Sequence, residues 1–420
     1  MSNIKKLLEG VEVEWKTLGE ITNILRGKRL TRNLLSANDK YPVFHGGLDP
    51  LGYYYNANRP ADTVMIINVG ASAGTVGYSS VDFWSSDGTY CIEQMAKLNN
   101  KFLYYFLLGE QYYLKSRVRV AGIPTLDAFV IEKLQIPIPY PNNLKKSLEI
   151  QQEIVRILDS FSMLTAELQA ELQARKSQYE YYRNQLLAYP MEESDQSSLR
   201  SNRSATSIQN SDNSIQPLST LNPPTGNSVL QPRGKVEWKV LEEVVEIKRG
   251  KRLIKNQLEK TGKYSVYQNC MIPLGYYHKN NVIADTTFII SAGSAGEIGY
   301  SDVDFWAADD VYYFVTKNDL KSRFLYHFLI TQQQKIYSQV RRSSVPRLSK
   351  TAFEKLLIPI PSLEEQEHIV SILDKFDALT TSLTEGLPKE IELRQKQYEY
   401  YRNMLLSFPK NNIKLVWDKH

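Results

Sequence analysis

Cysteine, histidine and long apolar runs are all scarce in this chain of 420 residues. The two cysteines, Cys91 and Cys270, lie far apart in the sequence, which argues against a disulfide framework and favours a reducing, cytoplasmic setting. The five histidines are scattered and no HExxH or paired CxxC spacing occurs, so no metal site is predicted. No apolar run approaches the roughly 20 residues of a membrane-spanning helix, so no membrane partner is expected.

A strong excess of either charge is also missing. The net charge of +5 is mildly basic, and by itself it neither indicates nor excludes a nucleic-acid partner. The 27 tyrosines suit surfaces that stack and form hydrogen bonds, but they suit ordinary sheet and interface packing equally well.

The chain does contain a long internal repeat, in which matching segments lie 219 to 223 residues apart. The matching segments are VEWKTLGEITNILRGKRLTRN from Val13 and VEWKVLEEVVEIKRGKRLIKN from Val236, VGYSSVDFW and IGYSDVDFW ending at Trp84 and Trp306, IPIP ending at Pro139 and Pro361, and QYEYYRN at 178–184 and 397–403. A period this long excludes a solenoid and predicts a duplicated module, a globular domain followed by a helix.

The globular part of each copy has the pattern of an α+β domain. Short apolar runs such as DTVMII from Asp62 and DTTFII from Asp285 are bounded by Gly, Asn and Asp, as β-strands are. KFLYYFLL from Lys101 and RFLYHFLI from Arg323 predict a helix in each copy. The IPIP segments then hold the backbone extended before the next helix begins.

Apolar residues spaced three and four apart follow each IPIP segment and predict a long coiled-coil helix. Ser362, three residues before Glu365, is typical of a helix N-terminus, and Ser147 stands at the matching position in the first copy. Gly386 and Pro388 predict a kink in the second helix alone. We expect the two helices to pair as an antiparallel coiled coil that joins the two domains into a pseudo-two-fold repeat.

These patterns divide the chain into six segments. The segment 191–232 contains ten serines, five asparagines and no aromatic residue, which predicts a flexible linker. The expected segments are domain 1 at 1–146, the central helix at 147–190, the linker at 191–232, domain 2 at 233–361, the distal helix at 362–409 and a tail at 410–420.

Two short motifs resemble catalytic signatures but predict no catalytic residue. Asn222-Pro223-Pro224-Thr225 is similar to the NPPY/F motif of amino-methyltransferases, but it ends in Thr where an aromatic ring would stack on a flipped base. Glu246 and Lys248 form an ExK pair as in many nucleases, but the aligned residues of the first copy, Asn23 to Leu25, do not.

Paired basic clusters are the positive signal for function. Arginine and lysine beside polar and aromatic residues suit DNA phosphate contacts and base readout, although solvated surface charge is the alternative explanation. The candidate DNA-binding residues are Arg26, Lys28, Arg29, Arg32, Arg117 and Arg119 in the first copy and Arg249, Lys251, Arg252, Lys255, Arg341, Arg342 and Arg347 in the second.

The order of motifs resembles the DNA-specificity subunit of type I restriction-modification enzymes. VEWKxL, RGKR, GYSxVDFW, IPIP, QxEIVxILDxF, EGLPKEI and RQKQYEYYRNxLL follow one another, mostly twice, over nearly the whole chain except the linker. The resemblance implies two target-recognition domains that read the halves of a bipartite double-stranded DNA sequence in a bacterial or archaeal cytoplasm. Because the two copies are so alike, we expect related and inversely oriented half-sites.

The resemblance also implies partner subunits. Two modification subunits would supply the adenine methyltransferase and S-adenosylmethionine, and two restriction subunits, where present, would supply ATP- and Mg-dependent translocation and cleavage. This chain would be non-catalytic and hold no cofactor of its own. The residues expected to meet the modification subunits lie on the outer face of the two identical QYEYYRN segments: Glu180, Tyr181, Arg183, Glu399, Tyr400 and Arg402.

Two other classes of function stay open at this point. The chain could be a self-sufficient DNA methyltransferase or nuclease, which turnover of S-adenosylmethionine by the purified chain would reveal. It could also be a coiled-coil scaffold that never binds DNA, in which case Arg29 and Arg252 would have no effect on DNA binding.

Overall fold

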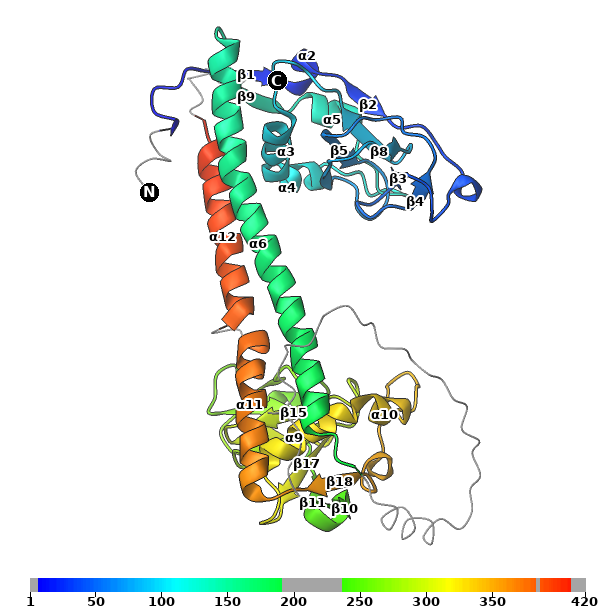
Figure 1. The fold of residues 1–420 in the computed structure, drawn as a ribbon, viewed down its shortest axis with the longest axis vertical. Helices are drawn as coiled ribbons and strands as arrows, with labels where there is room; N and C mark the ends of the chain where they lie inside the picture. The colour runs from blue at the N-terminus through cyan, green and yellow to red at the C-terminus, as the bar shows by residue number, and fades with distance from the viewer. Residues whose placement is uncertain (1–6, 191–235, 383–385, 409–420) are drawn as a thin grey trace. The chain divides into compact units, whose positions relative to one another are not determined.

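The computed structural model describes residues 7–190, 236–382 and 386–408 (Figure 1). The expected linker 191–232 and tail 410–420, together with the Asn222–Thr225 motif, lie outside these ranges. The chain divides into two compact units. Unit 1 comprises residues 1–170 and 390–420, and unit 2 comprises residues 171–389.

Unit 1 contains a domain of short strands and helices followed by a long helix. Its elements are β1 (Val13–Thr17), α2 (Leu18–Ile21), β2 (Ile24–Arg26), η1 (Arg32–Leu34), β3 (Tyr41–Phe44), β4 (Gly52–Tyr54), β5 (Thr63–Ile67), β6 (Val76–Ser79), β7 (Trp84–Ser85), β8 (Thr89–Ile92), α3 (Asn100–Gly109), α4 (Gln111–Ser116), α5 (Ala128–Glu132), β9 (Gln135–Pro139) and the first part of α6 (Leu144–Leu186).

A four-stranded antiparallel sheet in the order β2-β8-β5-β6 forms the centre of this domain. Strand β5, TVMII, is buried along its whole length, as a central strand rich in β-branched residues should be. Helix α3 packs against β5 and β6 and buries Phe102 and Leu103. Each fully buried side chain of this size contributes about 1.5–3 kcal/mol to folding.

Two smaller sheets complete the domain. Strands β4-β3-β7 form a mixed sheet in which β3 and β7 are parallel. Strand β9, QIPIP, pairs antiparallel with β1, so that Val13 lies opposite Pro139. Proline is tolerated here because a two-stranded ribbon leaves one edge of each strand free of ladder hydrogen bonds.

Unit 2 repeats the same order of elements. These are β10 (Glu237–Val240), α8 (Leu241–Val244), β11 (Val245–Arg249), η2 (Lys255–Gln257), β12 (Tyr264–Tyr267), β13 (Gly275–Tyr277), β14 (Thr286–Ile290), β15 (Ile298–Ser301), β16 (Phe305–Ala307), β17 (Val311–Thr316), α9 (Ser322–Thr331), α10 (Gln333–Ser338), η3 (Lys350–Ala352), β18 (Leu357–Ile360), α11 (Leu363–Thr381) and the start of α12 (Gly386–Leu406). The sheets β11-β17-β14-β15, β13-β12-β16 and β10-β18 correspond strand for strand to those of unit 1. The predicted pair of similar α+β domains is therefore confirmed.

Helix α6 continues from unit 1 into unit 2 and pairs antiparallel with a different helix in each. In unit 2, Tyr179 stacks on Phe376 of α11 with 6.2 Å between ring centroids, while Tyr189 donates a hydrogen bond to Glu365. Later residues of α6 therefore lie beside earlier residues of α11, so the two helices run in opposite directions. The antiparallel pairing predicted for the two copies is confirmed here.

The first half of α6 pairs in the same way with α12 in unit 1. Phe161 stacks on Tyr401 with 5.0 Å between ring centroids, and Ile154 shares a buried cluster with Leu405. Figure 1 shows the end of α12 beside the start of α6. Each unit thus joins one domain to its own helix and to the QYEYYRN segment of the other copy.

The beginnings of the helices differ in one respect from expectation. Ser362 caps α11, with its Oγ accepting from the Glu365 amide at 3.2 Å. Ser147 does not cap α6, because the helix begins earlier, at Leu144, and Asn143 accepts from the Lys146 amide at 3.1 Å. Residues 140–146, which have no counterpart in the second copy, supply this alternative cap.

The predicted break in the second helix is present, and the first copy has none. Helix α11 ends at Thr381 and α12 begins at Gly386, whereas α6 runs through 43 residues without interruption. Gly386 has a φ of 81°, and a Cβ there would lie 2.7 Å from the carbonyl oxygens of Ala378 and Leu379. Only glycine fits this turn without strain.

Candidate nucleic-acid interface

Several loops meet at one end of the four-stranded sheet in unit 1. Strand β2 ends at Arg26, which lies opposite Tyr90 near the start of β8. Strand β5 ends at Ile67, which lies opposite Thr89. Because neighbouring strands are antiparallel, the end of β2, the end of β5 and the turn before β8 all lie at the same end of the sheet.

The RGKR turn follows β2 and is fastened to this edge by backbone bonds. The Gly27 amide donates to the Thr89 carbonyl at 3.1 Å, and the Lys28 amide donates to the Ser85 carbonyl at 2.9 Å. The indole Nε1 of Trp84 donates to the Lys28 carbonyl at 2.9 Å. The tryptophan of the VDFW motif therefore holds the basic turn in place.

The second copy holds its RGKR turn by the same contacts. The Gly250 amide donates to Val311 at 2.9 Å, the Lys251 amide donates to Ala307 at 2.9 Å, and the indole of Trp306 donates to the Lys251 carbonyl at 3.0 Å. The turn is thus presented identically in both domains, which solvated surface charge alone does not require.

A seven-residue hairpin in each domain carries further basic residues. We call 119–125 the first hairpin and 341–347 the second hairpin. Arg119 and Thr125 exchange two backbone hydrogen bonds, at 2.9 and 3.0 Å, and Arg341 and Arg347 do the same at 2.9 and 3.1 Å. Both hairpins are therefore closed in the same way.

The first hairpin is attached to the sheet end that holds the RGKR turn. The Leu126 amide donates to the Asn68 carbonyl at 2.8 Å, and the Gly70 amide donates to the Pro124 carbonyl at 2.9 Å. The Asn68 amide in turn donates to Gly88 of the turn before β8, at 3.1 Å. Two basic clusters about 90 residues apart in sequence thus meet at one edge.

The second hairpin is attached in the same way. The Leu348 amide donates to the Ser291 carbonyl at 2.8 Å, and the Gly293 amide donates to the Pro346 carbonyl at 3.1 Å. The Ser291 amide donates to Asp310 at 2.7 Å, in the turn before β17. Each domain therefore places its two basic clusters at the same end of its sheet.

The predicted basic side chains are exposed, but they differ in whether they have partners. Arg26 and Arg249 donate to the carbonyls of Asp87 and Asp309, and each bond joins the RGKR turn of its domain to the turn before β8 or β17. Arg119 forms an ion pair with Asp127 at 2.8 Å, and Arg117 lies over the ring of Tyr113. Among the described residues, these candidates are exposed and have no ion-pair partner: Lys28, Arg29, Arg32, Lys251, Arg252, Arg341, Arg342 and Arg347. The side chain of Lys255 lies outside the described part of the chain.

One loop at this edge was not among the predicted site residues. In unit 1 it contains His45, whose Nδ1 lies 3.4 Å from the Asp87 carboxylate. In unit 2 the Ser294 amide donates to Asn269 of the matching loop at 2.9 Å. The two loops, HGGLD at 45–49 and QNCMI at 268–272, have equal length and no identical residue, although PLGYY follows both. This local loss of identity between the two copies was the signal in the sequence that could have identified the loop.

Comparison with known proteins decides the family. The family described as the type I restriction modification DNA specificity domain matches residues 10–175 and 234–393. The chain belongs to this family. It is 32% identical to the type I restriction enzyme EcoR124I/EcoR124II specificity subunit of Escherichia coli, with 98% of each chain covered. It is 26% identical to the EcoprrI specificity subunit of Escherichia coli, with 92% of each chain covered.

A solved structure shows the same fold. The S subunit of a type I restriction-modification system from M. genitalium superposes with a TM-score of 0.60 and 20% identity, covering 96% of this chain and 98% of that one. The family match and the curated relatives, together with this fold, make the chain a specificity subunit with two target-recognition domains. Each sheet end described above is the candidate DNA-recognition surface of one domain.

The QYEYYRN segments of this specificity subunit have one face buried and one exposed. Tyr179 and Tyr398 are buried, whereas Tyr181 and Tyr400 are 48% and 60% exposed. Glu180 and Glu399 are also exposed.

Arg183 and Arg402 were also expected on that outer face, but they do not lie there. The guanidinium of Arg183 lies over the ring of Tyr179, 5.3 Å from its centroid, and that of Arg402 lies over Tyr398 at 5.7 Å. The Nε of Arg183 is buried and has no hydrogen-bond partner among the described residues. Both arginines are half-buried on the side that faces a target-recognition domain, because helical geometry turns the fourth residue after Tyr179 and Tyr398 back to the same face.

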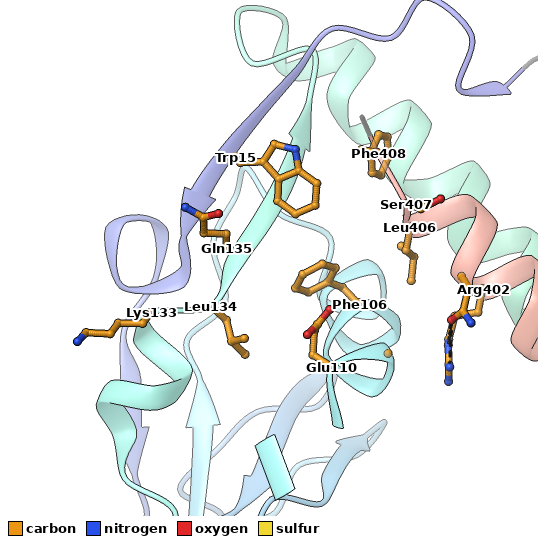
Figure 2. A pocket seen from close by; sticks show the side chains of 12 residues that line it. Trp15, Phe106, Glu110, Lys133, Leu134, Gln135, Arg402, Leu406, Ser407 and Phe408 are labelled. Atoms are coloured by element: carbon orange, nitrogen blue, oxygen red, sulfur yellow. Dashed lines mark hydrogen bonds between the residues drawn. The ribbon is translucent and has the colours of Figure 1, made fainter. Parts of the chain in front are cut away.

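Arg402 also lines a cavity of about 570 Å³ in unit 1. Figure 2 shows Trp15 and Phe106 on the domain side of this cavity and Leu406 and Phe408 at the end of α12 on the other. In unit 2 the matching tryptophan, Trp238, donates its indole Nε1 to the Pro190 carbonyl at 3.4 Å. The cavity is therefore part of the joint between helix and domain.

Buried polar contacts join each domain to the helices. Gln151 and Gln366 are fully buried, and each accepts a hydrogen bond from the amide before α3 or α9, at 2.7 and 2.8 Å. In unit 1 the hydroxyl of Tyr105 donates to Asp159 at 2.5 Å, and Lys101 forms an ion pair with the same carboxylate at 2.8 Å.

Unit 2 has a histidine where unit 1 has Tyr105. His327 is fully buried, with Nδ1 3.2 Å from the Tyr179 hydroxyl and Nε2 2.8 Å from Asp374. Arg323 bonds Asp374 at 2.7 Å and Asp377 at 3.0 Å. The network connects α9, α11 and α6, so one side chain links all three helices.

The pH dependence of folding should reflect this histidine. Burial lowers the pKa of His327 below its ordinary value of 6.5, although the bond to Asp374 opposes the change. Burial would raise the pKa of Asp374, but hydrogen bonds from His327 and Arg323 outweigh it and keep that pKa low, so Asp374 stays charged. The unfolded chain therefore binds a proton at His327 more readily than the folded chain does. The stability that neutral His327 contributes is fully present above about pH 6.5 and is lost as the pH falls towards the pKa of His327 in the folded state. Unfolding of unit 2, followed by hydrogen exchange in α9 at pH 7.5 and 5.5, should show weaker protection at the lower pH; equal protection would contradict this.

No helix within residues 7–190, 236–382 and 386–408 could span a membrane. In the same part of the chain, no group of three or more His, Cys, Asp and Glu side chains is arranged to hold a metal ion. The ExK pair of the sequence proves to be a local ion pair on β11, with Lys248 Nζ 2.9 Å from Glu246.

Proposed function

We propose that this specificity subunit reads a bipartite double-stranded DNA sequence, with each domain binding one half through its sheet end. The observation that supports this most directly is the duplication of the surface. Two basic clusters, far apart in sequence, are brought to one edge by backbone bonds that are the same in both domains. Exposed arginine and lysine without carboxylate partners are available for phosphates.

In this proposal the RGKR turns position the DNA backbone. Lys28 and Arg29 extend from a turn that three hydrogen bonds fasten to the sheet end, so little conformational entropy is lost in the main chain on binding. The same holds for Lys251 and Arg252. Phosphate contacts fix orientation and register without carrying sequence information, which agrees with a turn that is identical in both domains.

We further propose that the subunit is non-catalytic and assembles with two modification subunits, and with two restriction subunits where these exist. Methyl transfer with S-adenosylmethionine, and ATP- and Mg-dependent cleavage, would take place on those partners in the cytoplasm. The exposed faces of the two QYEYYRN segments support a pair of equal docking sites. Packing explains why Tyr179 and Tyr398 are the same, but it does not explain why exposed Tyr181 and Tyr400 are.

The DNA-binding proposal predicts a clear effect of the two turn arginines. Arg29→Ala and Arg252→Ala should each reduce affinity for the cognate duplex on the order of tenfold, because each removes one charge-assisted hydrogen bond. The slope of log affinity against log salt should shrink by about 0.9 for each phosphate that the protein no longer neutralises. Fluorescence anisotropy of the full-length subunit at several salt concentrations measures both quantities.

Arg156→Ala is the matched control for these variants. Arg156 is an exposed arginine on α6 that pairs with Glu153 at 2.7 Å, so its loss removes the same charge elsewhere. Unchanged DNA binding in the double variant Arg29→Ala/Arg252→Ala would favour a scaffold that does not bind DNA. Turnover of S-adenosylmethionine by the purified chain would favour the self-sufficient enzyme.

The docking proposal predicts a change in stoichiometry. Tyr181→Glu or Tyr400→Glu alone should lower the number of modification subunits bound from two to one, and the double variant should bind none, because a carboxylate replaces a ring that a partner would bury. Native mass spectrometry of the co-purified complex gives the count. Tyr112→Glu is the control, since Tyr112 is 87% exposed and lies on α4, outside both QYEYYRN segments. Two bound subunits in the double variant would remove the basis for this surface.

A further inference from the structure

The two hairpins have the same frame but different chemistry at the tip. Both span seven residues, both are closed by a pair of backbone bonds, and both are attached to the residues that follow the central strand. The first, RVAGIPT, exposes Val120 and Ile123 to 80% and 71%. The second, RRSSVPR, has Arg342 where the first has Val120 and Arg347 where the first has Thr125.

This contrast separates two roles at the sheet end. The RGKR turns are identical and identically held, so they cannot distinguish one half-site from the other. The hairpins keep the bonds that close and attach them and change the side chains that reach outward. Their tips differ in backbone as well, since Gly122 has a φ of 82° and Ser344 replaces it in the second hairpin. Segments that are held in the same place and differ in chemistry are suited to reading different bases.

The exposed side chains also match known base contacts. Each hairpin is a loop closed by one bridge, and the major groove is wide enough to admit even a full two-stranded ribbon. In that groove apolar side chains contact the thymine methyl group and arginine bonds guanine O6 and N7. Arg119 of the first hairpin is tied to Asp127, whereas Arg342 and Arg347 have no ion-pair partner among the described residues. Val345, which is 46% exposed, keeps the apolar character of Ile123, so the difference lies at the positions of Val120 and Thr125. There the first hairpin is equipped for methyl groups and the second for guanine.

We propose that each hairpin reads base edges in the major groove of its half-site, the first contacting thymine methyl groups through Val120 and Ile123 and the second contacting guanine through Arg342 and Arg347. This rests on the proposed DNA-binding function and goes beyond it by naming the reading element and the bases. The half-sites are then related only in part, and they differ at the positions under the hairpins.

Exchange of the hairpins tests this in the full-length subunit. The first hairpin is replaced by RRSSVPR, which preserves length and closing bonds, and duplexes are selected from a library with two randomised half-sites. The exchanged protein should gain guanine at the position where the wild type selects thymine, with the other half-site unchanged. An unchanged sequence in the first half-site overturns the inference while leaving the proposed function intact. A wild-type protein that selects no sequence overturns both.

Modified bases test which atoms of the DNA the two hairpins contact. Replacing thymine by deoxyuridine in the first half-site removes only the methyl group and should weaken wild-type binding several-fold. Replacing guanine by 7-deazaguanine in the second half-site removes the N7 acceptor and should weaken binding roughly 5- to 150-fold. The variant Arg342→Ala/Arg347→Ala should lose that sensitivity, whereas Lys145→Ala, on α6, should keep it. Wild-type affinity that is indifferent to both modified bases would place the contacts outside the major groove and overturn the inference.

Discussion

Replacing Gly27 with alanine should displace the first RGKR turn and weaken DNA binding at least as much as Arg29→Ala does. A Cβ at Gly27 would lie 2.1 Å from the Ser86 carbonyl oxygen and 2.5 Å from that of Ser85. Those oxygens belong to the backbone of the sheet edge, so neither can rotate away as a flexible side chain would. Overpacking of this kind costs about 1–3 kcal/mol.

The matched control is Gly47→Ala in the neighbouring loop. A Cβ there would meet nothing within 4 Å, so the RGKR turn should keep its position and stability should stay at the wild-type level. Gly250→Ala repeats the experiment in the second domain, where the Cβ would lie 2.1 Å from the Ala308 carbonyl oxygen. Thermal unfolding and anisotropy with the cognate duplex give the two measurements. Wild-type affinity in Gly27→Ala would show that the position of the turn does not matter for binding.

His327→Ala should destabilise unit 2 by about 2–4 kcal/mol, because it leaves a cavity and removes the partner of a buried tyrosine hydroxyl. Tyr179 would lose its hydrogen bond from α6 to α9, and Asp374 would keep only Arg323. Since the same residue links α9, α11 and α6, we expect the joint between domain 2 and its helices to open before the rest of the unit. Hydrogen exchange of α9 and denaturant unfolding measure this loss.

His327→Tyr is the control that the chain itself supplies. Tyr105 occupies this position in the first domain and donates to Asp159. The variant should lose less stability than His327→Ala, and its stability should no longer fall between pH 7.5 and 5.5, since tyrosine does not titrate there. If His327→Ala unfolds like the wild type, or if His327→Tyr keeps the same pH dependence, the network does not hold the joint.

Much of the architecture follows from local patterns that survive without tertiary context. The repeat required two domains of one fold, and alternating or buried runs such as that from Asp62 became strands. Gly386 and Pro388 broke the second helix because backbone geometry at glycine and proline is decided within a few residues. Ser147 failed as a cap because Asn143 offered an earlier one, a competition between neighbours that spacing alone does not resolve.

The candidate site could be predicted only in pieces. The RGKR turns stood out by recurrence, and the arginines of the hairpins by charge, but nothing in the sequence placed Arg29 and Arg119 at one sheet edge. The loop at 45–49 was missed because its signal was a loss of identity between copies. Strand order brings these segments together, and strand order depends on contacts between residues far apart in the chain.

The QYEYYRN segments show most clearly where sequence ends and tertiary structure begins. The sequence by itself determined that two equal helices exist and which face of each is apolar. It also required that these apolar faces pack against other parts of the protein. Only the tertiary structure decided that each segment packs on the domain of the other copy, with Arg183 and Arg402 stacked on Tyr179 and Tyr398. Tyr181 and Tyr400 are left on the exposed face. The physical reason is that helical periodicity specifies a face, whereas the partner that covers the face is chosen by the packing of the whole chain.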